Sequence, residues 1–486
     1  MTDPSLLLSA IPVVALLLFI AGILIYKGAD SISDYSVVAL LSTSALALVL
    51  SFFCGSLCRR GMIVGFRRSA RQILPAVPML IFISMISTTW VLSGVVPLLI
   101  EWGLRLLNPT TFLVVCCVVC GLISVLTGSS WSTIATLGVA FMGIGTIMGF
   151  HVGWVAGAII SGAYFGDKVS PLSDTTVVAS SACGVDLFKH IRYLMLTSIP
   201  AMLVALVVFF VVGLMFDPVS VEGTNEVLDL LNSHFNLAPA VLLIPVITFG
   251  LIALRVNTLI VLFVSSMLGL AGIFIFQPGI AEWLGVHGPV SGIVATAKLL
   301  WSESVFTTGH ELFDNLVSTS GITGMLSTIL LVLSAMVFGM AMIGTGMLSV
   351  LTRTLTKHIH TRFAIVGSTV GSGLFLNGFT ADQYLALIIG GNMYRNAYRR
   401  LGLEPRLLSR TLEDSVSVTS VLIPWNSCGV TQAAVLEVST IVYMPYCVFN
   451  YLSPIMSLVM AWTGFKIKQR ICGQKITSEL SDRVIA

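Results

Sequence analysis

The sequence predicts an all-α membrane protein that crosses the bilayer many times. Two features of the composition support this fold class: 56% of the 486 residues are hydrophobic and only 10% are charged, whereas soluble proteins carry about 25% charged residues. A third is the succession of long apolar runs, because a run of about 20 apolar residues can cross a membrane as a helix. The composition excludes an ordinary soluble domain, and no basic patch with interleaved aromatic residues indicates a nucleic-acid partner.

Ten of the apolar runs are predicted to cross the membrane. The first lies at the N-terminus without basic residues before it, and it is longer than the apolar core of a signal peptide, roughly 7–15 residues. We therefore expect an uncleaved helix there. The predicted spans are 6–26, 36–57, 73–100, 152–185, 191–215, 237–254, 257–277, 322–351, 411–436 and 439–464.

Two further apolar stretches, 110–150 and 363–394, are too long for one span and are interrupted midway by polar residues. The first is broken by Thr127–Trp131 (TGSSW) and the second by Asn377–Gln383 (NGFTADQ). Each half has roughly 14–20 residues, which is short for a hydrocarbon core of ~30 Å. We therefore expect two re-entrant hairpins whose tips lie inside the protein.

Basic and acidic residues are concentrated in different loops. Because loops rich in lysine and arginine stay in the cytoplasm, we expect both termini inside the cell and residues 466–486 to form a cytoplasmic tail. The basic loops are 59–71, 353–362, 395–410 and 466–475, and acidic residues dominate 217–229 and 278–321.

The spacing of the breaks predicts two inverted repeats. Thr127 lies 44 residues before Pro171, and Thr380 lies 44 residues before Pro424. Each half then has five spans and one re-entrant hairpin, and because five is odd the second half starts from the opposite face. Inverted repeats that meet at broken helices in mid-membrane are typical of secondary transporters. The predicted units are repeat 1 at 1–215, with hairpin 110–150 and broken helix 152–185, and repeat 2 at 237–465, with hairpin 363–394 and broken helix 411–436.

The run Gly162–Cys183, GAYFGDKVSPLSDTTVVASSAC, places charges in the middle of an apolar region. It holds Asp167, Lys168 and Asp174, and Pro171 lies among them. Such charges cost about 3 kcal/mol each unless they pair or face water, and the proline interrupts the helical hydrogen bonds. A broken helix with carboxylates and free carbonyls at this depth is how carriers build cation sites. The alternative interpretation is a structural ion pair in a kinked helix.

Oxygen-bearing side chains flank every one of the four breaks. A hard cation such as sodium binds carboxylate, hydroxyl, amide and carbonyl oxygens, and inverted symmetry is expected to bring these groups together. The candidates for binding sodium or a proton are Thr127, Ser129 and Ser130; Asp167, Ser173, Asp174 and Thr175; Asn377, Thr380 and Asp382; and Asn426 with Ser427.

A buried carboxylate is suited to exchanging sodium for a proton. Burial raises the pKa of a carboxyl group and a bound cation lowers it, so the two ligands compete. Asp174 is the first candidate, because it follows the proline and is surrounded by hydroxyl residues, and Asp167 is the second. Lys168 pairs with either acid or occupies the empty site as a surrogate cation. Glu413 and Asp414 follow two arginines at a membrane edge, which favours a capping or gating ion pair.

Several candidates have an equally simple structural role. Asp382 is a candidate N-cap for the returning half of the second hairpin, a common use of aspartate. Ser129 and Ser130 are candidate caps at the tip of the first hairpin, and Asn426 lies where a turn is needed in any case. The sequence leaves these alternatives open.

Several of these motifs together resemble the NhaC family of sodium/proton antiporters. The motifs are GAYFGDKVSPLSDTT at 162–176, TGSSW at 127–131, DQYLALIIGGNMY at 382–394 and LIPWNSCG at 422–429. The resemblance implies the ion-transporter superfamily, whose inverted repeats carry re-entrant hairpins, and an exchange of sodium for protons. A close branch exchanges sodium and lactate for malate and protons. Many relatives have asparagine after the Asp-Thr-Thr run, where this chain has Val177, so a side-chain ligand is not expected there.

The predicted function is a secondary transporter that exchanges Na⁺ for H⁺ across a bacterial inner membrane by alternating access. The alternative is a sodium-coupled exchanger of organic acids such as lactate and malate. An enzyme is not expected, because no HExxH motif occurs and no nucleophile elbow lies near the breaks, and inverted halves argue against a channel. The expected partners are Na⁺, H⁺ and the lipid bilayer, with a homodimer as a further possibility and no cofactor.

Overall fold

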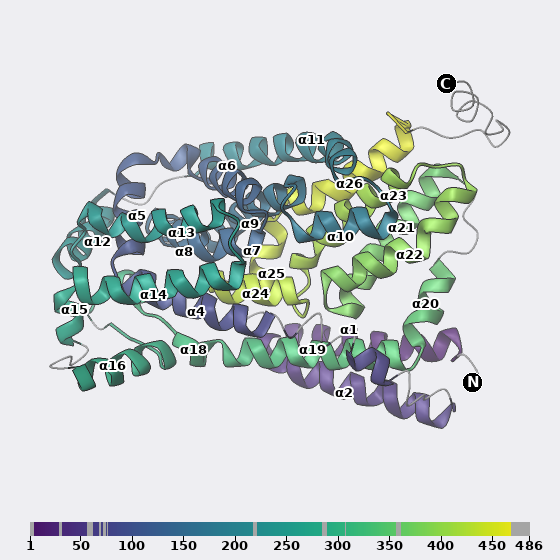
Figure 1. The fold of residues 1–486 in the computed structure, drawn as a ribbon, viewed down its shortest axis with the longest axis horizontal. Coiled ribbons are helices and arrows are strands. Elements are labelled where there is room, and N and C mark those ends of the chain that lie inside the picture. Colours follow the sequence, from purple (N-terminus) through teal and green to yellow (C-terminus); the bar gives the residue numbers. More distant parts are fainter. Residues whose placement is uncertain are drawn as a thin grey trace, which may run out of the picture.

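The structure, a computed structural model, describes residues 4–28, 32–55, 62–67, 70, 74, 76–216, 221–283, 289–306, 308–355 and 361–467. Long helices run side by side along one axis (Figure 1). Up to residue 234 they are α1 (Leu6–Lys27), α2 (Ile32–Phe53), α4 (Ala76–Leu92), α5 (Val95–Leu106), α6 (Pro109–Thr127), α7 (Ser130–Thr133), η1 (Ile134–Gly138), α8 (Val139–Ile147), α9 (Val152–Val169), α10 (Asp174–Cys183), α11 (Leu187–Leu214) and α12 (Val221–His234).

The remaining helices continue the same all-α pattern to the end of the described chain. They are η2 (Pro239–Leu242), α13 (Leu243–Ala253), α14 (Thr258–Phe276), α15 (Pro278–Trp283), α16 (Pro289–Trp301), α17 (Glu311–Val317), α18 (Gly321–Gly324), α19 (Leu326–Gly344), α20 (Met347–Leu355), α21 (Arg362–Thr380), α22 (Gln383–Arg400), α23 (Pro405–Leu412), η3 (Glu413–Ser417), η4 (Ser420–Leu422), α24 (Ser427–Leu436), α25 (Thr440–Tyr443), η5 (Met444–Tyr446) and α26 (Val448–Thr463).

The prediction of an all-α protein with many membrane spans is confirmed. Eight helices of the described chain are long and apolar enough to cross a membrane, or up to eleven if each of three sharply bent pairs forms one span. The bends are 65° between α4 and α5, 85° between α12 and the η2–α13 segment, and 54° between the α25–η5 segment and α26.

Both long interrupted stretches break where the sequence predicts. α6 ends at Thr127 and α7 begins at Ser130, while α21 ends at Thr380 and α22 begins at Gln383. The two first halves, α6 and α21, have 19 residues each, which corresponds to about 28 Å at the helical rise of 1.5 Å per residue. Their length alone therefore permits a full crossing, and the re-entrant course of the hairpins stays a prediction.

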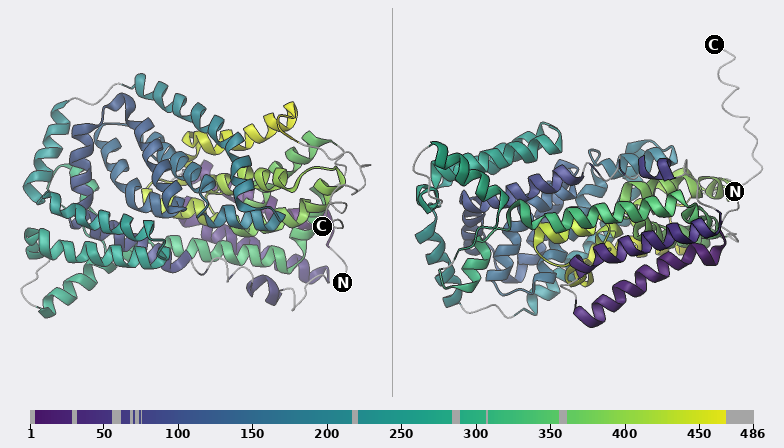
Figure 2. Two further views of the ribbon diagram at one scale, coloured as in Figure 1. Left: turned by 45° about the horizontal axis from the view of Figure 1, so that its top comes forward. Right: turned by 90° about the horizontal axis from the view of Figure 1, so that it is seen from below.

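Buried apolar side chains form two clusters. One is built mainly from α4–α9 together with the segment after Val418. The other joins α1, α2 and α19 to α21–α23, and Figure 2 shows α1, α2 and α19 along one side of the bundle. Trp131, beside the break between α6 and α7, packs against the first cluster, and Val178 of α10 packs against the second.

Glycines allow α6 and α9 to pack backbone against backbone. A Cβ atom added at Gly162 would lie 2.1 Å from the carbonyl oxygen of Cys117, and one at Gly166 would lie 2.2 Å from that of Gly121. Small residues at such contacts let membrane helices approach closely. This contact fixes the helix that carries Asp167 and Lys168.

Gly162→Ala should lower the thermal unfolding temperature of the protein in detergent, because α6 and α9 must separate to make room for the methyl group. Overpacking of this kind costs about 1–3 kcal/mol. The matched control is Gly371→Ala in α21, where no atom lies within 4 Å of the added Cβ; it should leave the unfolding temperature unchanged or slightly raised. An equal loss in both variants would show that the α6–α9 contact is not the cause.

Charged segments are separated along the long axis. The arginine-rich turn between α22 and α23 lies at the right-hand end in Figure 1, where α1 begins and α26 ends, whereas α12 and α15 lie at the opposite end. This arrangement agrees with basic and acidic loops on opposite faces of the membrane. The expected tail lies outside the described residues from residue 468 onward, as do parts of the charged loops 59–71, 217–229, 278–321 and 353–362.

Candidate ion-binding site

The break in the middle of Gly162–Cys183 forms as the sequence predicts. α9 ends at Val169 and α10 begins at Asp174, because Pro171 between them has no N–H to donate. The Ser173 hydroxyl caps α10 by accepting a hydrogen bond from the Thr176 amide at 3.5 Å. The turn therefore leaves two helix ends inside the protein.

The tip of the first hairpin packs directly on this turn. Gly128 has φ 68°, and a Cβ atom at this position would lie 2.6 Å from the carbonyl carbon of Leu172. Only glycine combines this left-handed conformation with so close an approach. The contact brings α6 and α7, with their hydroxyl side chains, against the end of α9.

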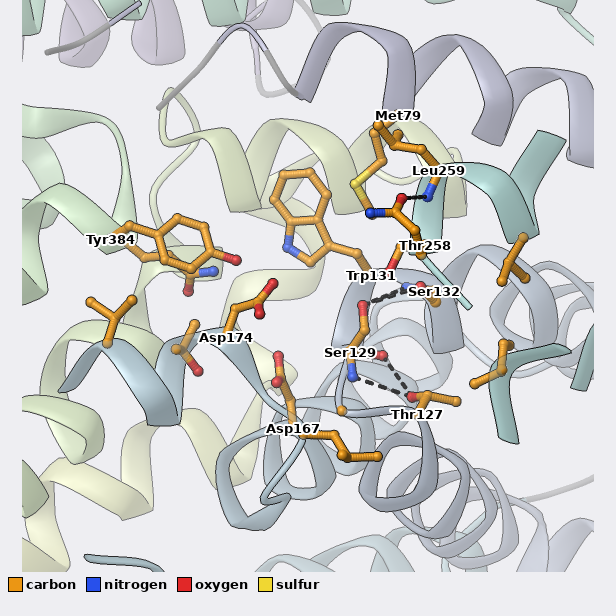
Figure 3. Close-up of a pocket in the computed structure, with 18 of the residues that line it drawn as sticks. Met79, Thr127, Ser129, Trp131, Ser132, Asp167, Asp174, Thr258, Leu259 and Tyr384 are labelled. Carbon is orange, nitrogen blue, oxygen red and sulfur yellow. Dashed lines mark hydrogen bonds between the residues drawn. The ribbon is translucent and has the colours of Figure 1, made fainter. Parts of the chain in front are cut away.

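A cavity of about 720 Å³ lies between the broken helix and the two hairpin tips. Figure 3 shows its wall, with the Asp167 and Asp174 carboxylates near each other. Of the candidates from the sequence, seven line it: Thr127, Ser129, Asp167, Asp174, Thr175, Asp382 and Ser427.

Asp167 is the buried carboxylate on this wall. Its side chain is 9% exposed, and its Oδ2 atom accepts hydrogen bonds from the Ser130 amide at 3.2 Å and the Ser130 hydroxyl at 2.7 Å. Asp174, the first candidate from the sequence, is exposed at the first residue of α10. The burial expected of Asp174 is therefore found at Asp167, and Ser130 contacts the site through Asp167 rather than through the cavity.

The hydroxyl groups of Thr127 and Ser129 make hydrogen bonds within the tip of the first hairpin and also line the cavity. Ser129 caps α7, since its Oγ atom accepts hydrogen bonds from the amide and the hydroxyl of Ser132 at 3.2 and 3.1 Å. The Thr127 hydroxyl accepts a hydrogen bond from the Ser129 amide at 3.2 Å. Both roles anticipated for Ser129, cap and wall of the cavity, are thus present together.

At the second tip, Asp382 and Ser427 reach the cavity. Asp382 caps α22, with its Oδ1 atom 2.8 Å from the Leu385 amide, and it also lines the cavity. The backbone N–H of Ser427 donates to the carbonyl oxygen of Ala381 at 2.8 Å. This bond ties the break before α24 to the hairpin tip.

The other polar candidates of the second half hold the backbone together. The side-chain amide of Asn377 donates to the backbone carbonyl oxygen of Val416 at 2.7 Å. The side-chain amide of Asn426 donates to the backbone carbonyl oxygen of Asn377 at 3.0 Å. The Thr380 hydroxyl donates to the carbonyl oxygen of Asp382 at 2.7 Å. Asn377 and Asn426 therefore connect the hairpin to the broken helix, Thr380 closes the tip itself, and none of the three lines the cavity.

Behind the cavity lies a buried ion pair between Lys168 and Asp414. The lysine is 1% exposed and also donates to the Ser453 hydroxyl at 2.7 Å. Asp414 accepts further hydrogen bonds from hydroxyl groups of Thr197 at 3.0 Å and Ser457 at 2.6 Å. Lys168 is paired, but its partner is Asp414, 246 residues away, and not Asp167 or Asp174 as the sequence suggested.

Four of the cavity residues that were not among the candidates from the sequence carry polar or charged groups next to the site. Gln383 and Tyr384 directly follow Asp382, and Arg255 and Asn257 form the turn between α13 and α14. The first two belong to the quoted run DQYLALIIGGNMY, so the motif itself was a signal for them. Arg255 and Asn257 looked like an ordinary loop between two spans, and the sequence offered no signal.

The walls of the cavity are suited to a hard cation. Carboxylate, hydroxyl and amide oxygens come from α6, α7, α9, α10 and α22, and sodium binds such oxygens. Asp167 and Asp382 are buried carboxylates, whereas Asp174 stands in the open part of the cavity. The cavity therefore offers an ion access from its open part at Asp174 to the buried carboxylates of Asp167 and Asp382.

Comparisons with known proteins identify the family of this chain. The model of the Na⁺/H⁺ antiporter family matches residues 5–186 and 162–465. The chain is 33% identical to the Na(+)/H(+) antiporter NhaC of Alkalihalophilus pseudofirmus over 390 residues, 80% of this chain and 82% of that protein. It is 33% identical to the malate-2H(+)/Na(+)-lactate antiporter of Bacillus subtilis over 393 residues, 80% and 81% of the two chains. It is also 34% identical to the arginine/ornithine antiporter ArcD of Halobacterium salinarum over 407 residues, 83% and 81% of the two chains. The chain therefore belongs to the Na⁺/H⁺ antiporter family.

Proposed function

We propose that this protein exchanges Na⁺ for H⁺ across the cell membrane by alternating access, with Asp167 as the carboxylate that binds sodium. The observation that carries the proposal is the position of Asp167. It is buried, it accepts two hydrogen bonds from Ser130, and it lies on the wall of a cavity that reaches both hairpin tips. A carboxylate in such surroundings favours a bound cation or a proton over an unpaired charge.

The ligand set that we propose is narrower than the one drawn from the sequence. Asp167, Ser129, Thr127 and Asp382 offer oxygens to the cavity, while Thr175 donates its hydroxyl proton to Glu413 and is not counted as a ligand. Asp174 provides negative charge near the entrance and raises the local concentration of cations.

The architecture fits alternating access between two inverted repeats, 1–215 and 237–465. In each repeat a hairpin tip contacts a broken helix, at Gly128 against Leu172 in the first and at Ala381 against Ser427 in the second. We further propose a position in the inner membrane with both termini in the cytoplasm, in agreement with the arginine-rich end of the bundle, and assembly as a homodimer.

Proteoliposomes with an acidic lumen should test the exchange directly. Adding sodium outside should drive protons out, so that a pH-sensitive dye in the lumen reports alkalinisation without any organic anion present. Potassium or choline at equal ionic strength is the control and should give no response. Absence of sodium-dependent proton movement in protein that is folded and inserted would contradict the proposal.

A second candidate function is sodium-coupled exchange of an organic acid. Two observations favour it: the cavity of about 720 Å³ is larger than a sodium ion needs, and Arg255 on its wall offers a positive charge to a carboxylate. One relative is named a malate-2H(+)/Na(+)-lactate antiporter. In the same vesicles, this candidate requires that proton movement depend on added lactate or malate.

A further inference from the structure

Glu413 is a second buried carboxylate, behind the cavity wall and outside the cavity itself. It lies in the π-helical segment η3 and is 0% exposed. The hydroxyl of Thr175 donates to its Oε1 atom at 2.9 Å, while its Oε2 atom has no hydrogen-bond partner. An ionised carboxylate with so little hydrogen bonding is unfavourable away from water.

Hydroxyl groups connect Glu413 to the cavity. Thr175 lines the cavity and contacts Glu413, and its Oγ1 atom lies 2.9 Å from the hydroxyl of Ser173. A hydroxyl both donates and accepts hydrogen bonds, so this pair can pass a proton between Glu413 and the cavity.

The charges that face Glu413 come from a few elements. α9 contributes Lys168 and Asp167, and α10 contributes the thiol of Cys183. On its own segment Asp414 is adjacent and Arg410 lies one turn earlier. Four other groups on the packed elements have partners elsewhere: Arg362 of α21 donates to Ala461, His190 of α11 contacts Ser409, Arg395 of α22 donates to Ala182, and Arg406 of α23 contacts Glu404. The rest are exposed, namely Asp174 of α10, Lys189 and Arg192 of α11, and Arg399 and Arg400 of α22; α26 carries no charged residue.

The buried region around Glu413 has one more negative than positive charge when all its groups are ionised. Lys168 and Arg410 supply two cations, while Asp167, Glu413 and Asp414 are three carboxylates. Asp382 is counted separately, because the positive N-terminal end of α22, which it caps, offsets its charge. One additional cation, either sodium or a proton, therefore makes the region neutral.

Hydrogen bonding indicates which carboxylate takes the proton. Asp414 has Lys168 and three hydroxyl donors, and Asp167 has two donors from Ser130. Glu413 has one hydrogen-bond donor, the hydroxyl of Thr175, and the hydroxyl of Ser417 lies near it without a hydrogen bond. Donors stabilise the ionised form, so Glu413 is the carboxylate least suited to carry a negative charge when sodium is absent.

We propose that the proton exchanged for sodium is held on Glu413 rather than on Asp167, and that Thr175 passes it to the cavity. When sodium binds at Asp167 it supplies the missing positive charge, and Glu413 can ionise. Its O–H bond breaks as the Thr175 oxygen takes the proton, and the original Thr175 proton moves to water in the cavity, which Thr175 lines. This inference rests on the proposed exchange of sodium for protons at Asp167.

The test compares two kinds of transport by the full-length protein in liposomes. Glu413→Gln imitates the protonated side chain permanently, so counterflow of radioactive sodium should persist at saturating sodium and should no longer change with pH. Sodium-driven proton movement should fall about a hundredfold, in keeping with the loss of a positioned proton carrier. Glu413→Asp restores a carboxylate and should restore part of the coupling. Thr175→Val should slow proton movement more than Thr175→Ser, which keeps the hydroxyl.

The outcomes separate this inference from the proposed function. Normal proton movement in Glu413→Gln would place the proton elsewhere and overturn the inference, while sodium exchange at Asp167 would stand. Loss of both sodium counterflow and proton movement in a variant with an unchanged unfolding temperature would also overturn it, because Glu413 would then be needed for sodium. If Glu413→Gln does not fold, equal proton movement in Thr175→Val and Thr175→Ser overturns it. Unchanged sodium counterflow in Asp167→Asn would instead contradict the proposed function.

Discussion

Asp167→Asn should abolish both sodium counterflow and sodium-driven proton movement, with a loss of at least about a hundredfold, or about 2.7 kcal/mol. The amide oxygen of asparagine can still accept the hydrogen bonds that Ser130 donates to Asp167, so the tip of the first hairpin should keep its position. What the substitution removes is the buried negative charge. The measurement is transport in proteoliposomes, together with the unfolding temperature to show that the fold is retained.

Asp174→Asn is the matched control for this result. The two carboxylates lie on the same cavity wall (Figure 3), but Asp174 is exposed, and interactions of exposed charges are screened by salt. We expect a loss of no more than about tenfold, which should shrink further as the ionic strength rises. A larger loss in Asp174→Asn than in Asp167→Asn would mean that exposure in this conformation does not identify the ion-binding carboxylate.

The positions of the breaks could be predicted from the sequence because local chemistry decides them. Pro171 cannot continue a helix, Gly128 adopts φ 68°, and Asp382 caps the helix that it precedes. Each signal lies within a few residues of the structure that it produces. The fold class follows from composition for the same reason, since long apolar runs need no tertiary information to form membrane helices.

The burial of particular side chains could not be predicted in this way. Asp167 is buried where the tip of the first hairpin packs on α9, and Ser130, 37 residues earlier, donates two hydrogen bonds to it there. Asp174 instead begins a helix whose first turn faces the cavity. In the second half, the Oδ1 atom of Asn426 accepts a hydrogen bond from the backbone amide of Cys428, and Asn377 donates its side-chain amide to backbone and does not line the cavity. Only the packing of the hairpins on the broken helices decides which oxygens remain for an ion.

Lys168→Met should destabilise the protein by about 3–5 kcal/mol, because removing one partner of a buried ion pair leaves the other charge uncompensated. Asp414 would keep its hydroxyl donors, and Arg410 is 3.7 Å away, but no ammonium group would contact it. The measurement is thermal unfolding in detergent. The double variant Lys168→Met with Asp414→Leu should recover much of the loss, since replacing both charges by apolar groups is often tolerated.

The ion pair Arg105–Glu101 is the matched comparison for this prediction. Its atoms lie 2.7 Å apart, but Arg105 is 61% exposed, so Arg105→Ala should cost less than about 1 kcal/mol. Equal losses of stability from the buried and the exposed pair would contradict the prediction.

The same variants test the role of the lysine in transport. If the double variant folds and still exchanges sodium for protons, Lys168 only balances a buried charge. If it folds but does not exchange them, the charge of Lys168 is part of the transport cycle. The first outcome is expected, because in the structure Lys168 contacts Asp414 and Ser453 and does not line the cavity.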